Sequence, residues 1–205
     1  MTNVDIDRPT RDMIAAGALF HQRGWVPATG GNFSARLSPE RMLITASGWH
    51  KGELAPEAFL VADLQGRPED ASRKASYETL LHCQLYRIDA GIGAALHTHS
   101  VANTLLSLQQ SSVRLAGYEL LKLLPGISTH DAVVEIPVFE NDQDIARLAS
   151  AIDAHMKKQA VAAYLIKGHG LYAWGSSVAQ ARHRVEALEF MFECELRKQE
   201  LEKKS

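Results

Sequence analysis

The sequence predicts a three-layer α/β/α domain whose central sheet is largely antiparallel. Segments with helical periodicity alternate along the chain with short amphipathic strands, an order that places helices on both faces of a sheet. Tight turns join several of these strands, and such hairpin signals argue against a doubly wound parallel sheet. The chain has 205 residues, of which 46% are hydrophobic, so it can bury a substantial core. We expect a single domain over residues 1–205.

Apolar periodicity and N-capping residues predict five helices. The first carries Met13, Ala16 and Phe20 on one face and ends near Gly24. Ser76 and Ser100 are expected to cap the second and third. The five segments are residues 10–23, 76–88, 100–108, 145–156 and 177–203.

Strands are predicted between these helices. Residues 33–37 and 42–45 should form a hairpin, since Ser38-Pro39-Glu40 is a typical turn sequence, and residues 59–63 add a further strand. Apolar runs at 93–100 and 161–170 are also strand candidates, the second pairing with residues 171–174 across a glycine bend. Pro137 places the strand at 133–139 at an edge or an end of the sheet.

Composition excludes several classes of protein. A formal net charge of −2 gives no reason to expect binding to nucleic acid or to an anionic membrane surface. No apolar stretch approaches a membrane span, and the polar residues 1–11 do not read as a signal peptide. Cys83 and Cys194 are far apart, which is typical of reduced thiols. We therefore expect a cytoplasmic protein.

Three histidines stand at the ends of predicted strands. His97 and His99 are two residues apart, so in an extended strand both point to one face, about 6.5–7 Å apart at Cα. His169 lies between two glycines that let the backbone bend closely around it. Three neutral nitrogens with one open position describe a catalytic zinc site. The alternative is that each histidine is a hydrogen-bonded strand-end residue. His82, four residues after Glu78, is expected to pack.

Two further segments suit an anion. Residues 30–34 (GGNFS) combine the exposed backbone N–H groups of Gly31 with the side chain of Asn32. Residues 45–51 (TASGWHK) add a hydroxyl at Ser47, a flexible position at Gly48 and a cation at Lys51. Phosphate is the expected ligand. A nucleotide is not implied, because the sequence contains no P-loop pattern.

Five motifs occur in a recognisable order over residues 10–192: the GGNFS loop, Ser47-Gly48, Ser76-Tyr77-Glu78, His97-x-His99 and Gly168-His169-Gly170. Their order and identity resemble the class II aldolase/adducin family. The resemblance implies one zinc ion per subunit on His97, His99 and His169. It also implies a sugar phosphate held at the positions of Asn32, Ser47, Gly48 and Ser76, and a homotetramer with sites near subunit boundaries.

Five further sequence segments resemble one branch of that family. They are residues 46–52 (ASGWHKG), 78–82 (ETLLH), 97–100 (HTHS), 118–122 (YELLK) and 136–141 (IPVFEN). The implied activity is zinc-dependent dehydration of 5-methylthioribulose 1-phosphate in methionine salvage, with Glu119 as the acid/base. The alternative within the family is a sugar-phosphate aldolase or epimerase that relies on Glu78. An adducin-like interaction module is the alternative from another class, but such proteins lose the metal histidines.

Overall fold

The computed structural model describes residues 6–202. Its sheet consists of β1 (Asn32–Arg36), β2 (Arg41–Thr45), β3 (Phe59–Asp63), β4 (Ala94–Thr98), β5 (Ser112–Ala116), β6 (Val133–Phe139), β7 (Tyr164–Ile166) and β8 (Gly170–Gly175). The eight strands lie in the order β3-β2-β1-β4-β8-β7-β6-β5. Only β6 and β7 pair in parallel among the described residues; the other neighbours are antiparallel. The predicted sheet type is confirmed.

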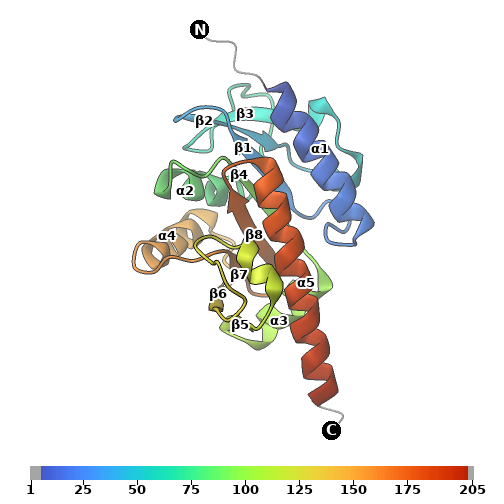
Figure 1. Cartoon of the computed structure of the whole chain (residues 1–205). Coiled ribbons are helices and arrows are strands. Elements are labelled where there is room, and N and C mark those ends of the chain that lie inside the picture. Colours follow the sequence, from blue (N-terminus) through green and yellow to red (C-terminus); the bar gives the residue numbers. More distant parts are fainter. Residues whose placement is uncertain (1–5, 203–205) are drawn as a thin grey trace.

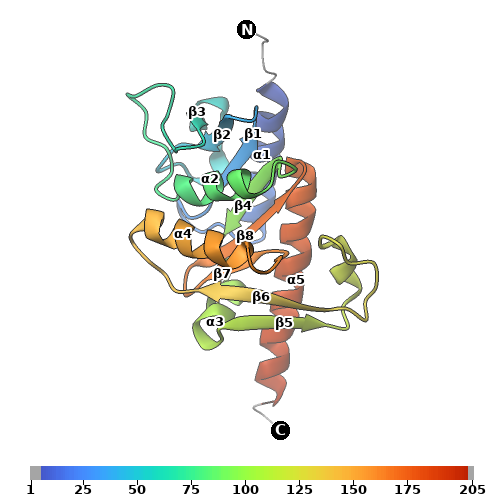
Figure 2. The same cartoon turned by 90° about the vertical axis from the view of Figure 1, so that its left-hand side faces the viewer.

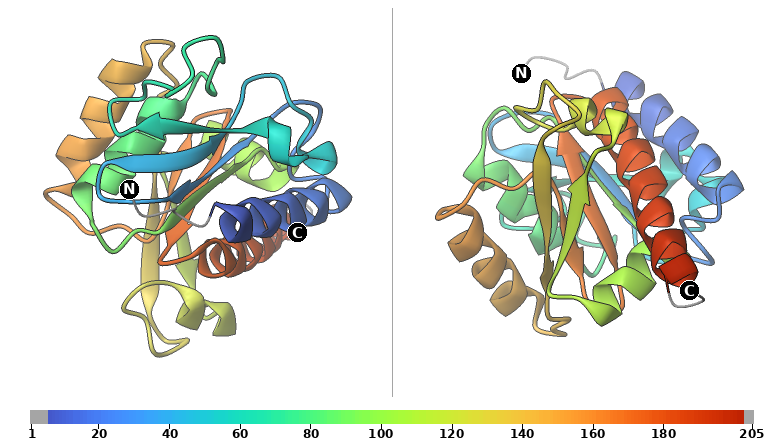
Figure 3. Two further views of the ribbon diagram at one scale, coloured as in Figure 1. Left: turned by 90° about the horizontal axis from the view of Figure 1, so that it is seen from above. Right: turned by 60° about the horizontal axis from the view of Figure 1, so that its bottom comes forward.

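Helices cover both faces of this sheet (Figures 1 and 3). They are α1 (Asp7–Gln22), α2 (Thr79–Ile88), α3 (Val101–Gln109), α4 (Ile145–Met156) and α5 (Val178–Glu202), with short 3-10 helices η1 (Lys51–Glu53), η2 (Pro56–Ala58) and η3 (Glu119–Leu123). α1 and α5 lie on one face, and α2 and α4 on the other. None of the described helices is both long enough and apolar enough to cross a membrane.

Alternation along the central strands divides the core into two apolar clusters, one per face. On β4, Ala94 and Leu96 belong to the cluster under α1 and α5, whereas Ala95 belongs to the cluster under α2 and α4. Because successive side chains of a strand point to opposite faces, His97 falls on the α2 side and Thr98 on the α5 side. The strand thus presents its histidines to α2.

Several element boundaries differ from the predictions for identifiable reasons. α2 begins after Glu78 rather than at Ser76, because residues 75 and 76 are held against the end of β2 by backbone hydrogen bonds. β5 was not predicted at all. Its pairing with β6 puts β6 inside the sheet instead of at an edge. Pro137 is accommodated because it faces Ser112, where the pairing with β5 ends. The predicted last helix extends to residue 203, which lies outside the described residues.

Candidate metal centre

The three predicted histidines converge at one end of the central strands. His97 is in β4, His99 follows it, and His169 sits in the turn between β7 and β8. The Nε2 atom of His97 lies 2.7 Å from Nε2 of His99 and 3.4 Å from Nε2 of His169. One nitrogen from each ring falls within 4.8 Å of the others. Tetrahedral zinc with bonds of about 2.0–2.1 Å needs donors roughly 3.3 Å apart. The His97–His169 separation matches this spacing, and the shorter His97–His99 separation requires only a small turn of the His99 ring for the three nitrogens to fit the ion.

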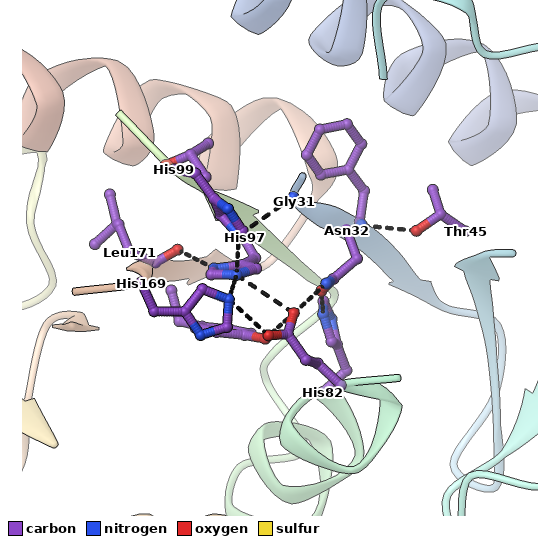
Figure 4. Close-up of polar contacts among 12 residues, drawn as sticks. Gly31, Asn32, Thr45, His82, His97, His99, His169 and Leu171 are labelled. Carbon is purple, nitrogen blue, oxygen red and sulfur yellow. Dashed lines mark hydrogen bonds and ion pairs between the residues drawn. The ribbon is translucent and has the colours of Figure 1, made fainter. Parts of the chain in front are cut away.

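The surroundings keep two of these imidazoles neutral and ready to bind a metal. Burial lowers the pKa of His97 well below its usual value and that of His99 to about 4. His97 Nδ1 lies 2.8 Å from the Leu171 carbonyl, which can only accept, so Nδ1 carries the proton and Nε2 keeps its lone pair. The polar contacts are drawn in Figure 4.

Gly170 makes the close approach of the His169 turn possible. A Cβ atom at this position would lie 2.1 Å from the Thr98 carbonyl oxygen and 2.8 Å from Cε1 of His97. Any side chain would therefore collide with the backbone of β4. The sequence predicts a flexible glycine at this position, and the contact with β4 shows that the position must also lack Cβ.

Glu78 places a carboxylate against the histidine nitrogens. Its Oε1 lies 2.8 Å from Nε2 of His169, and its Oε2 lies 3.3 Å from Nε2 of His97. Tyr172 donates its hydroxyl proton to Oε2 at 3.1 Å. Burial alone raises the pKa of Glu78, but His169 and the amide of Asn32 favour its charged form, and the pKa lies well below the usual range. The group is therefore an ionised carboxylate facing the position of the metal.

Behind Glu78 runs a chain of buried hydrogen bonds. Asn32 donates its amide N–H to Glu78 at 2.5 Å, so its Oδ1 is free to accept from Nε2 of His82 at 2.5 Å. His82 Nδ1 then accepts from Ser34 at 2.6 Å, and Ser34 accepts from the Tyr86 hydroxyl at 2.7 Å. Burial lowers the pKa of His82 to about 4, which matches the single ring proton this pattern needs. His82 is buried as expected, but it also supports the site.

The segments predicted to hold phosphate come together beside the histidines. The Gly31 N–H donates to Nε2 of His99 at 3.3 Å. Ser47 and Gly48 form an exposed turn, which lies next to Ser76 because Ala46 bridges to Ala75. Asn32 is 3% exposed, with both ends of its amide already engaged by Glu78 and His82.

Lys51 is buried rather than free at the surface of its loop. Its ammonium group donates to the carbonyls of Thr29 at 2.9 Å and Trp49 at 2.6 Å. Burial lowers its pKa to about 8, although the charge of Glu78 acts in the opposite direction. Lys51 thus ties the 27–31 loop to the 47–50 turn. It has one ammonium proton left for an anion.

Glu119 is not brought to the histidines within one chain. It begins η3, which follows the end of β5 where Ala116 pairs with Val133, whereas the histidine end of the sheet lies beyond the opposite pair, Ser112 and Pro137. Figure 2 shows the loop after β5 at the far side of the sheet. Its side chain is 72% exposed and lies 2.6 Å from the ammonium of Lys122, which lowers the pKa of Glu119.

Comparison with known proteins defines the class first. The Class II Aldolase and Adducin N-terminal domain matches residues 11–196, and the chain belongs to this family. It is 48% identical over 198 residues to methylthioribulose-1-phosphate dehydratase of Pseudomonas aeruginosa PAO1, covering 95% of this chain and 97% of the relative. Identity to the dehydratase of Gluconobacter oxydans is also 48%, over 202 residues, with 96% and 97% covered.

Solved structures agree with the fold. The l-fuculose-1-phosphate aldolase of Thermus thermophilus superimposes with a TM-score of 0.77 at 26% identity, covering 95% of this chain and 97% of that one. A further L-fuculose 1-phosphate aldolase has a TM-score of 0.81 at 20% identity, covering 98% and 91%. The histidine end of the sheet therefore belongs to a fold that also carries aldolases.

Proposed function

We propose that this protein dehydrates 5-methylthioribulose 1-phosphate to 5-methylthio-2,3-dioxopentyl phosphate, a step of methionine salvage. Support comes from the 48% identity to dehydratases over nearly the whole chain. The structural observation that carries the proposal is the convergence of three histidine nitrogens on one point, which supplies the metal site that this reaction needs. We further propose that the protein acts in the cytoplasm as one class II aldolase-like domain per subunit.

His97, His99 and His169 would hold one zinc ion. Three neutral imidazoles leave the ion its full positive charge, so a bound zinc would stabilise the negative charge that develops when the C3 proton of the substrate is lost. The spacing of the Nε2 atoms and the Nδ1–H contact of His97 to Leu171 support this ligand set. The fourth position would be left to Glu78 or to substrate.

The phosphate group would bind at the loops that Lys51 ties together. The turn of Ser47 and Gly48 and the hydroxyl of Ser76 offer donors there. The backbone N–H of Gly31, which donates to Nε2 of His99, would become available once that nitrogen binds the metal. Asn32 would assist only by giving up its contact with Glu78 or His82. An anchored phosphate is unchanged through the reaction, so these groups would fix the geometry of the substrate rather than lower the barrier directly.

Dehydration needs a carboxylate that removes the C3 proton and a proton donor for the C4 hydroxyl, which leaves as water. The enol product then tautomerises to the diketone. We propose that Glu119 is this acid/base and that Glu78 chiefly serves the metal. Because Glu119 lies at the far end of the sheet in its own chain, it would have to act at the histidines of a second copy. Exposed Val101, Leu105 and Leu108 of α3 support subunit contacts in the homotetramer that we propose.

A sugar-phosphate aldolase is the second candidate, and the position of Glu78 favours it. Within one chain Glu78 is the carboxylate, among the described residues, that contacts the histidine cluster. An aldolase would cleave a carbon–carbon bond with the same metal and phosphate groups.

Substrate turnover by the zinc-loaded protein separates the two functions. We expect release of water from 5-methylthioribulose 1-phosphate, followed as the appearance of the diketone, and no turnover of fuculose 1-phosphate or ribulose phosphate. The control is the same protein after a chelator has removed its zinc. Cleavage of fuculose 1-phosphate to an aldehyde and a three-carbon ketone phosphate, with no diketone from the methylthio sugar, would replace the dehydratase by the aldolase.

A further inference from the structure

Glu189 of α5 is a buried acid that the proposed reaction does not use. Its residue is 2% exposed and lies between fully buried Leu188 and Met191. Among the described residues no cation forms an ion pair with it, and its Oε2 atom has no hydrogen-bond partner. Burying a carboxyl group without a cation is costly, whereas an apolar side chain would suit this apolar surrounding. Its presence therefore calls for a role other than filling the core.

The hydrogen bonds of Glu189 all reach the segment that carries two of the histidines. Oε1 accepts from the hydroxyl of Thr98 at 2.6 Å and from the side-chain amide of Asn103 at 2.9 Å. The hydroxyl of Ser100 contributes as well, and these three donors partly offset burial, which raises the pKa of Glu189 to about 7. Thr98 stands between His97 and His99.

The contacts join the end of β4 to the start of α3. Ser100 caps α3 by accepting from the N–H of Asn103 at 3.0 Å, and Asn103 also reaches the carbonyl of Thr98 at 3.4 Å. Thr98 points to α5 because side chains alternate along β4, so the histidines beside it point to α2. One carboxyl oxygen thus fixes, from the opposite face of the sheet, the backbone from which His97 and His99 project.

We propose that Glu189 is a positioning residue for the metal centre: its Oε1 holds Thr98 and Asn103 so that the His97 and His99 nitrogens stay aimed at one point. This inference rests on the proposed metal site. Outer groups that orient metal ligands typically change metal affinity by about 10–100-fold when they are removed. The role requires a hydrogen-bond acceptor at Oε1 rather than a negative charge.

Three variants test this requirement. Glu189→Leu removes the acceptor and keeps an apolar volume, Thr98→Val removes one donor at nearly constant shape, and Glu189→Gln keeps an acceptor at Oε1. Glu193→Gln is the matched control, because Glu193 lies one turn further along α5 with a side chain 54% exposed. For each, zinc affinity is measured by competition with a chelator, and the visible spectrum of the cobalt-loaded protein reports the ligand geometry. Thermal unfolding of the metal-free form reports the fold.

We expect Glu189→Leu and Thr98→Val to weaken zinc binding about 10-fold or more and to change the cobalt spectrum. Glu189→Gln should recover most of the affinity, and Glu193→Gln should match the parent. Parent affinity and spectrum in both Glu189→Leu and Thr98→Val would overturn the role of Glu189 while leaving the metal site intact. If Glu189→Leu does not fold, Thr98→Val decides alone. A parent protein that binds neither zinc nor cobalt would overturn the metal site itself, and this inference with it.

Discussion

Individual side chains at the histidine cluster should separate metal binding from folding. Replacing His97, His99 or His169 singly by Ala removes one of three nitrogen donors, so each variant should lose most of its zinc and nearly all activity. The two apolar clusters do not include these residues, and the far-ultraviolet circular dichroism should stay that of the parent. His130→Ala, whose side chain is 54% exposed, is the control and should keep both. Zinc per chain is measured by plasma emission spectrometry. Full zinc occupancy in His169→Ala would show that His169 is not a metal ligand.

At this scale the sequence predicts some groups and not others. The His97-x-His99 spacing and the glycines around His169 are local signals, because strand alternation alone brings the first two rings to one face. The series of hydrogen bonds that runs from Tyr86 to Glu78 depends on how α2 packs against β1, and no local sequence pattern encodes that packing. Glu189 carries no signal either, since an acid in a long amphipathic helix is ordinarily at the surface.

The hairpin of β7 and β8 is the element on which the third ligand depends. Gly170→Ala would place a methyl group 2.1 Å from the Thr98 carbonyl oxygen, and that carbonyl cannot retreat without disturbing the pairing of Thr98 with Leu171. Overpacking of this kind costs about 1–3 kcal/mol. We expect a lower free energy of unfolding in urea and weaker zinc binding.

The control for this hairpin is Gly91→Ala, where the nearest atom to the new methyl is a carboxylate oxygen of Asp89 at 3.1 Å. A small shift of that side chain relieves this contact and keeps its hydrogen bond to the N–H of residue 91. Its stability should stay close to that of the parent. A Gly170→Ala protein as stable as the parent, with parent zinc affinity, would contradict the view that this hairpin and β4 are in fixed contact.

Helices and strands with a clear hydrophobic periodicity are well predicted, whereas elements whose structure depends on pairing with other segments are not. The segment 145–156 is α4 as expected, and 133–139 is β6, because each has its own apolar pattern or capping residue. β5 was missed because only Val113 and Leu115 face the core, and its strand state depends on pairing with β6. The start of α2 was misplaced because backbone contacts with β2 hold residues 75 and 76 extended.

Two substitutions test which glutamate carries the proton in the proposed homotetramer. Glu119→Gln is nearly isosteric but cannot accept the C3 proton, so it should keep zinc and substrate binding and lose about 10²–10⁴-fold in turnover. Glu78→Gln should be milder or act through metal affinity. Exchange of the C3 proton with solvent deuterium should stop in Glu119→Gln. Normal turnover in Glu119→Gln, together with an inactive Glu78→Gln that still binds zinc, would instead favour Glu78 as the acid/base, as in an aldolase.

Mixing two inactive variants tests where Glu119 acts. Chains with Glu119→Gln keep the three histidines, and chains with His169→Ala keep Glu119, so neither assembly alone has a complete site. If Glu119 serves the histidines of a neighbouring copy, mixed assemblies contain some complete sites, and activity should return after the two variants are unfolded together and refolded. Chains carrying both changes, mixed with Glu119→Gln, are the control and should stay inactive. No recovery in the first mixture, with mixed assemblies verified by mass, would place the acid/base within a single chain, where Glu78 is the carboxylate at the histidines.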